Sequence, residues 1–354
     1  MLVAVQSTVT EQPWSAEDSL AELTRLAESA GADVVGVRSQ HLGTPSGTHY
    51  VGRGKLQELK DLKATLDYTL LIADDELTPR QQRTLEDELA VRVIDRTALI
   101  LDIFAHRART SEGKLQVELA QHRYLLPRLI GRWEHLERLG GGIGTRGPGE
   151  SQLETDRRLI KLHISRLEKD LDAVRRHREV YRSRRRKEGV PLVALVGYTN
   201  AGKSTLFNTL SQAGVTAENR LFSTLDPVTR RVRLPHGTYA LFTDTVGFIH
   251  KLPPSIIAAF RTTLEELDEA DLLVHVVDIT HKDAARQHAA VEQILTEIKL
   301  AAKPVVTALN KVDLLQDDLR EDTSGMRDRL SAARTDFVPV SAVTGWNVPE
   351  LLER

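Results

Sequence analysis

The stretch GYTNAGKS, from Gly197 to Ser204, fits the pattern G-x-x-x-x-G-K-[ST] and decides how the C-terminal half of the chain folds. The apolar run LVALV precedes it and the segment TLFNTLSQ follows it. A buried strand, a glycine-rich turn and a helix in this order form a P-loop. The N–H groups of Asn200 to Ser204 are expected to close around phosphate oxygens at the N-terminus of the helix. Lys203 should reach the β- and γ-phosphates, and the Ser204 hydroxyl should bind Mg²⁺.

Two further motifs would complete a phosphate and metal site. The segment FSTLDPVTR (222–230) places Thr224 in a switch loop, where its hydroxyl can complete the coordination of Mg²⁺. The run DTVG (244–247) ends a predicted strand, so Asp244 can hold Mg²⁺ and the Gly247 N–H can contact a γ-phosphate. We therefore predict Lys203, Thr224 and Gly247 as catalytic residues, and Ser204, Thr224 and Asp244 as Mg²⁺ ligands.

The run NKVD (310–313) points to the base. Its Asp313 can accept hydrogen bonds from both N1–H and the exocyclic amine of guanine, whereas adenine offers neither donor in that geometry. A site built around such an acceptor discriminates strongly, because the wrong base leaves a buried carboxylate unpaired. Ser341-Ala342 follows the last strand and could give a backbone N–H to the guanine oxygen.

Each motif alone could be an ordinary strand-end turn, but four in the required order favour a guanine-nucleotide site. Phe248 stands where Ras-like enzymes place the Gln that orients the attacking water, so we expect slow intrinsic hydrolysis. The predicted nucleotide-binding residues are Gly197, Tyr198, Thr199, Asn200, Ala201, Gly202, Lys203, Ser204, Thr205, Phe222, Ser223, Thr224, Leu225, Asp226, Asp244, Thr245, Val246, Gly247, Asn310, Lys311, Val312, Asp313, Ser341, Ala342 and Val343.

Alternation of strands and helices predicts an α/β fold at both ends of the chain. Residues 189–354 should form a doubly wound, Ras-like P-loop domain, and residues 1–113 a small α/β subdomain with a largely parallel sheet. Strands are expected in the small subdomain at Val34–Val37, Thr69–Ala73 and Val91–Ile94. Residues 114–188 are predicted to be an antiparallel helical hairpin around the glycine-rich loop GGGIGTRGPGE, with the apolar residues of both helices at helical spacing.

The net charge of −2 conceals a basic centre. Residues 1–113 hold 12 basic against 18 acidic residues, 114–188 hold 19 against 11, and 189–354 hold 17 against 21. From Arg175 to Lys187, eight of thirteen residues are Lys or Arg. Such a stretch fits a polyanion, although a solvated helix face or a basic linker has the same composition. The candidate RNA contacts are Arg146, Arg175, Arg176, Arg178, Arg182, Arg184, Arg185, Arg186 and Lys187.

Composition excludes several classes of protein. Because the sequence has no cysteine, it can form no disulfide and no thiolate metal site. It also contains no run of 18 apolar residues, so no membrane-spanning helix is predicted. The start lacks the pattern of a signal peptide, so a cytoplasmic location is expected. None of the 12 histidines shows metal-ligand spacing. Only eight residues follow Trp346, which suggests that the last helix of the domain is cut short.

At the level of whole motifs the chain resembles the HflX family of translational GTPases. The resemblance rests on VGRGKLQEL (51–59), RVIDRTALILDIFAHRARTSEGKLQVELAQ (92–121), GGIGTRGPGESQLETDRR (141–158), GYTNAGKSTLFN, FSTLDP and DTVGFI. It implies Mg²⁺-dependent hydrolysis of GTP, binding to ribosomal RNA of the large subunit, and splitting or recycling of stalled ribosomes under stress. A monomer is expected. Two alternatives stay open, a GTPase of large-subunit assembly and a nucleotide-dependent RNA-remodelling protein with an ATP activity in its N-terminal part.

Overall fold

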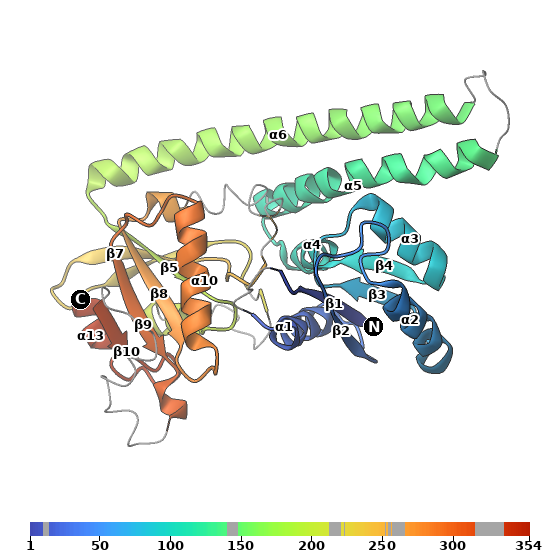
Figure 1. Ribbon diagram of the computed structural model, residues 1–354. Coiled ribbons are helices and arrows are strands. Elements are labelled where there is room, and N and C mark those ends of the chain that lie inside the picture. Colours follow the sequence, from blue (N-terminus) through green and yellow to red (C-terminus); the bar gives the residue numbers. More distant parts are fainter. Residues whose placement is uncertain are drawn as a thin grey trace. The chain divides into compact units, whose positions relative to one another are not determined.

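The computed structural model of the chain describes residues 1–9, 14–139, 148–211, 221–222, 224–251, 253, 256, 266–315 and 336–354. It divides into two compact units, one made of 1–106, 114–173 and 253–259, the other of 107–113, 174–252 and 260–354. Each unit contains a sheet that is wholly or mostly parallel, with helices packed beside it (Figure 1), which confirms the predicted α/β class. None of the helices in the described ranges is both long and apolar enough to cross a membrane.

The first unit is built on a four-stranded sheet in the order β2-β1-β3-β4, with every neighbouring pair parallel. Its strands are β1 (Leu2–Ser7), β2 (Val37–Leu42), β3 (Leu70–Ala73) and β4 (Arg92–Asp95). Its helices are α1 (Ala16–Ser29), α2 (Arg53–Leu66), α3 (Pro79–Leu89) and α4 (Arg96–Arg107). Thr78 caps α3 by accepting the Gln81 N–H, and the Gln81 side chain accepts the Thr78 N–H in return, so the helix begins with proline at its first position.

The strand predicted at Val34–Val37 is displaced. The structure begins β2 only at Val37 and extends it through the polar run RSQHL to Leu42. β2 is an edge strand that pairs only with β1, so its exposed positions tolerate polar residues. The apolar residues 34–36, on which the prediction rests, lie just before the strand.

Two long helices follow, α5 (Ser111–Leu139) and α6 (Pro148–Glu188). Figure 1 shows them antiparallel, as predicted. Leu119 of α5 packs with Leu167 and Leu171 of α6, and Arg123 pairs with Glu168 at 2.5 Å. The apolar spacing of both helices therefore serves packing.

The second unit carries a six-stranded sheet in the order β10-β9-β8-β5-β7-β6, parallel except for the edge strand β6. The strands are β5 (Leu192–Gly197), β6 (Val228–Arg233), β7 (Tyr239–Asp244), β8 (Leu272–Asp278), β9 (Val305–Asn310) and β10 (Asp336–Pro339). The described helices are α7 (Lys203–Ser211), α10 (Ala284–Glu297), a 3-10 turn η1 (Val312–Leu314) and α13 (Val348–Glu353). β5 is central and buried along its whole length, so the loop that leaves it is held rigidly.

Candidate functional site

The turn between β5 and α7 requires its glycines. Gly197 has φ +151°, and a Cβ there would lie 2.3 Å from the Val276 carbonyl oxygen. Gly202 has φ +94°, and a Cβ there would lie 2.2 Å from Asn310 Nδ2. Both positions therefore exclude any side chain, which is the physical reason for two of the fixed residues of the motif.

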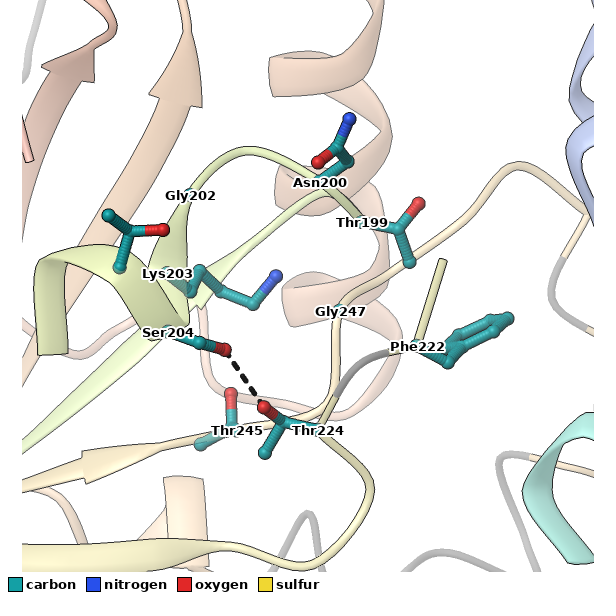
Figure 2. Close-up of a pocket in the computed structure, with 10 residues that line it drawn as sticks. Thr199, Asn200, Gly202, Lys203, Ser204, Phe222, Thr224, Thr245 and Gly247 are labelled. Carbon is teal, nitrogen blue, oxygen red and sulfur yellow. Dashed lines mark hydrogen bonds between the residues drawn. The ribbon is translucent and has the colours of Figure 1, made fainter. Parts of the chain in front are cut away.

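The pocket around this turn brings together residues of three predicted motifs. Its lining residues are Thr199, Asn200, Gly202, Lys203, Ser204, Thr205, Phe222, Thr224, Thr245 and Gly247 (Figure 2). All ten are predicted nucleotide-binding residues. The Thr199 hydroxyl is buried in this pocket and has no hydrogen-bond partner among the described residues.

Lys203 is buried, and its ammonium group donates to the carbonyl oxygens of Gly197 at 3.2 Å and Tyr198 at 2.8 Å. Burial lowers the pKa of Lys203 to about 8, against an opposing effect of the Asp244 carboxylate. The charged form, which attracts phosphate, therefore predominates only below about pH 8.

This pKa predicts that nucleotide affinity falls as the pH rises. Between about pH 7.0 and 8.5 the charged fraction of Lys203 drops, and we expect the Kd for GTP to increase about fourfold. The phosphate groups stay ionised over this range, since their last pKa is about 6. Titration of a fluorescent GTP analogue at constant ionic strength measures the effect, and a flat profile would contradict the assignment of Lys203 as the phosphate-binding cation. Lys203→Met should bind weakly at every pH.

Three side-chain oxygens converge beside Lys203. Ser204 Oγ lies 2.8 Å from Thr224 Oγ1 and 2.7 Å from Asp244 Oδ2, and Thr224 Oγ1 lies 2.9 Å from the same carboxylate oxygen. Asp244 Oδ1 is buried with no hydrogen-bond partner among the described residues. Burial raises the pKa of Asp244, whereas the hydroxyl donors and Lys203 oppose the rise. Two hydroxyls and a carboxylate with an unsatisfied oxygen are ligands that suit Mg²⁺.

The segment after Asp244 is attached to the P-loop by its backbone. Phe248 N–H donates to the Gly197 carbonyl at 3.0 Å, and Thr199 N–H donates to the Phe248 carbonyl at 2.7 Å. The Phe248 ring is 2% exposed, so it packs in the interior. A Cβ on Gly247 would lie 2.9 Å from Thr199 Cα, which keeps that position free of side chains.

The NKVD motif (310–313) lies at the end of β9. Asn310 connects two loops: its amide donates to the Ala201 carbonyl at 2.8 Å and accepts from the Ala342 N–H at 2.9 Å. Lys311 pairs with Asp278 at 2.6 Å. Asp313, the last residue of the motif, is half-buried and lies in η1. The structure thus makes Asn310 the connector of the P-loop and the Ser341-Ala342 loop.

Other predicted site residues are placed as follows. Leu225, Val246 and Val312 do not line the pocket; Leu225 and Val312 are buried, and Val343 is exposed. The Asp226 carboxylate accepts three hydrogen bonds from residues 109 and 110. Ser223 lies outside the described residues.

The candidate RNA contacts are described only in part. Arg175 is half-buried and Arg176 is exposed on α6. Arg178 forms ion pairs with Glu112 at 2.7 Å and with Glu266 at 3.0 Å. Its positive charge is therefore balanced by carboxylates of the protein itself. The remaining candidates on α6 continue the helix, but their side chains are outside the described part of the chain, as is all of Arg146; they are Arg182, Arg184, Arg185, Arg186 and Lys187.

One cluster was missed by sequence spacing. Glu118 and His122 of α5 meet His163 of α6, with their potential ligand atoms within 4.8 Å of one another. The two helices are separated by the glycine-rich loop, so only the antiparallel pairing of the hairpin could have indicated this contact.

Family models match three consecutive stretches of the chain. Residues 17–105 match the description "GTP-binding GTPase N-terminal", 107–185 "GTP-binding GTPase Middle Region", and 192–311 "50S ribosome-binding GTPase". Each model covers less than half of the chain, and together they span most of it.

Curated relatives extend this similarity over most of the chain. A protein named GTPase HflX from Caldanaerobacter subterraneus subsp. tengcongensis is 51% identical over 300 residues, which cover 85% of this chain and 70% of that protein. GTPase HflX from Escherichia coli is 45% identical over 95% of this chain and 78% of that protein. A solved structure described as a complex of SsGBP and GDP has a TM-score of 0.52 at 27% identity, covering 99% of this chain and 95% of that one.

Proposed function

The chain belongs to the HflX family of GTPases and hydrolyses GTP, and from that premise we propose that it binds the large ribosomal subunit and splits stalled ribosomes under stress. The observation that carries the catalytic part is the convergence of Ser204, Thr224 and Asp244 beside the ammonium group of Lys203. Support for the ribosomal partner comes from the family description of residues 192–311, "50S ribosome-binding GTPase".

The phosphate chemistry follows from the residues of the pocket. Lys203 and the N–H groups of the P-loop bind the β- and γ-phosphates and stabilise the charge that develops as water attacks the γ-phosphorus. The Gly247 N–H is proposed to contact the γ-phosphate, since the segment of Gly247 and Phe248 is attached to the P-loop. Mg²⁺, when held by Ser204 and Thr224 and supported by Asp244, would neutralise charge on the β- and γ-phosphate oxygens.

Guanine selection is assigned to Asp313, with Asn310 as the residue that holds the surrounding loops. Asn310 ties Ala201 to Ala342, so the P-loop and the Ser341-Ala342 loop keep a fixed spacing. The Asp313 carboxylate follows directly in η1 and is proposed to accept both donors of the guanine edge.

Phe248 stands at the position where Ras-like enzymes place the glutamine that orients the attacking water. Phe248 is buried and apolar, and it cannot hydrogen-bond water. We propose that contact with the ribosome orders the switch loop around Thr224 or supplies the missing group. GTP would then favour the ribosome-bound arrangement of the loop, and hydrolysis would release it.

Sedimentation distinguishes splitting from assembly. Intact ribosomes are mixed with the full chain and a non-hydrolysable GTP analogue and separated on a sucrose gradient. Splitting predicts that the intact-ribosome peak gives way to separate subunits, with the chain in the large-subunit fraction. Binding to large subunits with the intact peak preserved would favour an assembly role, and binding to neither would contradict a ribosomal partner. The same mixture with GDP is the control.

A further inference from the structure

We propose that Asp226 is a positioning residue, which holds the switch loop so that Thr224 meets Ser204 and Asp244. Its carboxylate accepts the Arg109 N–H at 2.7 Å and the Thr110 N–H at 2.8 Å on Oδ2, and the Thr110 hydroxyl at 2.5 Å on Oδ1. The proposal rests on the proposed role of Thr224 as a Mg²⁺ ligand.

The contact is formed by the two residues that directly precede α5. Thr110 precedes this helix, and its hydroxyl accepts the N–H of Gly113, as a helix N-cap does. Asp226 therefore places a negative charge against backbone N–H groups at the N-terminal end of a 29-residue helix, where a carboxylate is stabilised. We call this set of contacts between Asp226 and residues 109–113 the switch clasp.

Gly113 leaves the space that the carboxylate occupies. A Cβ on Gly113 would lie 2.2 Å from Asp226 Oδ1 and 3.2 Å from its Cγ. A side chain at position 113 would thus push Asp226 out of the clasp. The same segment is fixed from another direction, because the Arg178 guanidinium joins Glu112 to Glu266.

Because Asp226 is close to Thr224 along the chain, the contacts that fix Asp226 also restrain the position of Thr224. It is the second residue after Thr224, and β6 begins at Val228, so the switch loop is tied immediately after its metal-binding residue. Because residues 109–113 lead directly into α5, the clasp also connects the nucleotide-dependent loop with the start of the helical hairpin. Release of Thr224 after hydrolysis would therefore loosen the start of α5.

The test measures Mg²⁺ dependence, using variants outside the pocket. Thr110→Val removes one donor and Gly113→Ala removes the space. Both are expected to raise the Mg²⁺ concentration that half-saturates binding of a non-hydrolysable GTP analogue by about tenfold or more, the effect of one hydrogen bond to a charged group. GDP affinity should stay within about twofold, since only the triphosphate state uses Thr224. Thr110→Ser should restore normal behaviour, and Thr296→Val, on the exposed face of α10, is the matched control.

The outcomes separate this proposal from the proposed function. Thr224→Ala should raise the Mg²⁺ requirement at least as much as the clasp variants do. A large effect of Thr224→Ala with none for Thr110→Val and Gly113→Ala overturns the positioning role alone. No effect of Thr224→Ala overturns the metal-ligand assignment and the positioning role with it. Equal losses for GDP and the GTP analogue would show a merely structural contact and overturn the positioning role. Hydrogen exchange at the amides of Arg109 and Thr110 should be slower with the GTP analogue than with GDP.

A different observation points to a transition-metal site in the helical hairpin, and we infer that Glu118, His122 and His163 can bind Zn²⁺ there. Glu118 and His122 are one helical turn apart on α5, and His163 faces them from α6. Glu118 Oε1 lies 2.9 Å from His163 Nε2 and 3.9 Å from His122 Nε2. The centroids of the two imidazole rings are 4.7 Å apart. Two imidazoles and a carboxylate form a ligand set that Zn²⁺ uses, with a further position left for water.

The state of His122 agrees with this role. Its Nδ1 is buried and has no hydrogen-bond partner among the described residues, so no hydrogen bond in that part of the chain competes with a metal ion for this nitrogen. Because the chain has no cysteine, no thiolate competes for the ion.

Equilibrium dialysis of the full chain against Zn²⁺, with excess Mg²⁺ and GDP present, tests the site. We expect one Zn²⁺ per chain and a rise in Tm on binding, both lost in His163→Ala and His122→Ala. His106→Ala, an exposed histidine outside the cluster, should behave as the unmodified chain. Absence of stoichiometric binding, or binding that survives His163→Ala, would overturn the inference.

Discussion

Replacement of Asp313 by asparagine is expected to lower GTP affinity by about 100- to 1000-fold and to raise affinity for XTP. The carboxylate is proposed to accept both guanine donors, and an amide would present its own N–H₂ group to one of them. Loss of one partner of a buried, charge-assisted pair costs about 3–4 kcal/mol, which sets the size of the effect. Xanthine presents an oxygen in place of the exocyclic amine, so the introduced amide can donate to it.

Competition binding with GTP, XTP and ATP measures this change in preference. The matched control is Asp268→Asn, which alters an exposed carboxylate of the same unit. Unchanged GTP affinity in the Asp313→Asn variant would show that another group reads the base. A gain of ATP binding would contradict the guanine assignment of the whole motif.

The substitution Gly247→Ala is expected to lower GTP turnover about 100-fold or more, with a much smaller change in GDP affinity. The added Cβ would lie 2.9 Å from both Cα and Cγ2 of Thr199 and 2.8 Å from Lys203 Nζ. The Gly247 segment must therefore move away from the P-loop, and its N–H would no longer face the γ-phosphate. Loss of one such donor typically costs about 100- to 1000-fold in rate.

Single-turnover hydrolysis and GDP titration together measure this effect. Gly54→Ala is the matched control, because its Cβ would meet no atom within 4 Å. If Gly247→Ala hydrolysed GTP at the normal rate, the proposed γ-phosphate contact would be wrong. If GDP binding fell as much as turnover, the glycine would matter for the pocket as a whole.

The α/β class and the phosphate pocket could be predicted from sequence for one physical reason. The carboxyl ends of parallel strands meet at one edge of a sheet, so motifs at the ends of β5, β7 and β9 must come close together. Ser204, Thr224 and Asp244 accordingly converge, although they lie up to 40 residues apart. The need for glycine at positions 197 and 202 could also be predicted from the motif, because it depends on local backbone geometry.

Contacts between distant segments could not be predicted in this way. Thr110 and Asp226 are 116 residues apart, and no sequence motif containing one of them predicts contact with the other. The Glu118, His122 and His163 cluster depends on the register of two helices, which apolar spacing does not define to within one turn. The role of Asn310 as a connector was also hidden, since the motif alone suggests contact with the base.

GTP turnover with and without large ribosomal subunits tests the central claim most directly. With Phe248 buried where a water-orienting glutamine would stand, the chain alone should hydrolyse GTP slowly. Added large subunits are expected to accelerate turnover at least about tenfold, because on this proposal they order the switch loop or supply the group that Phe248 cannot provide. Equal turnover in both conditions would contradict the account.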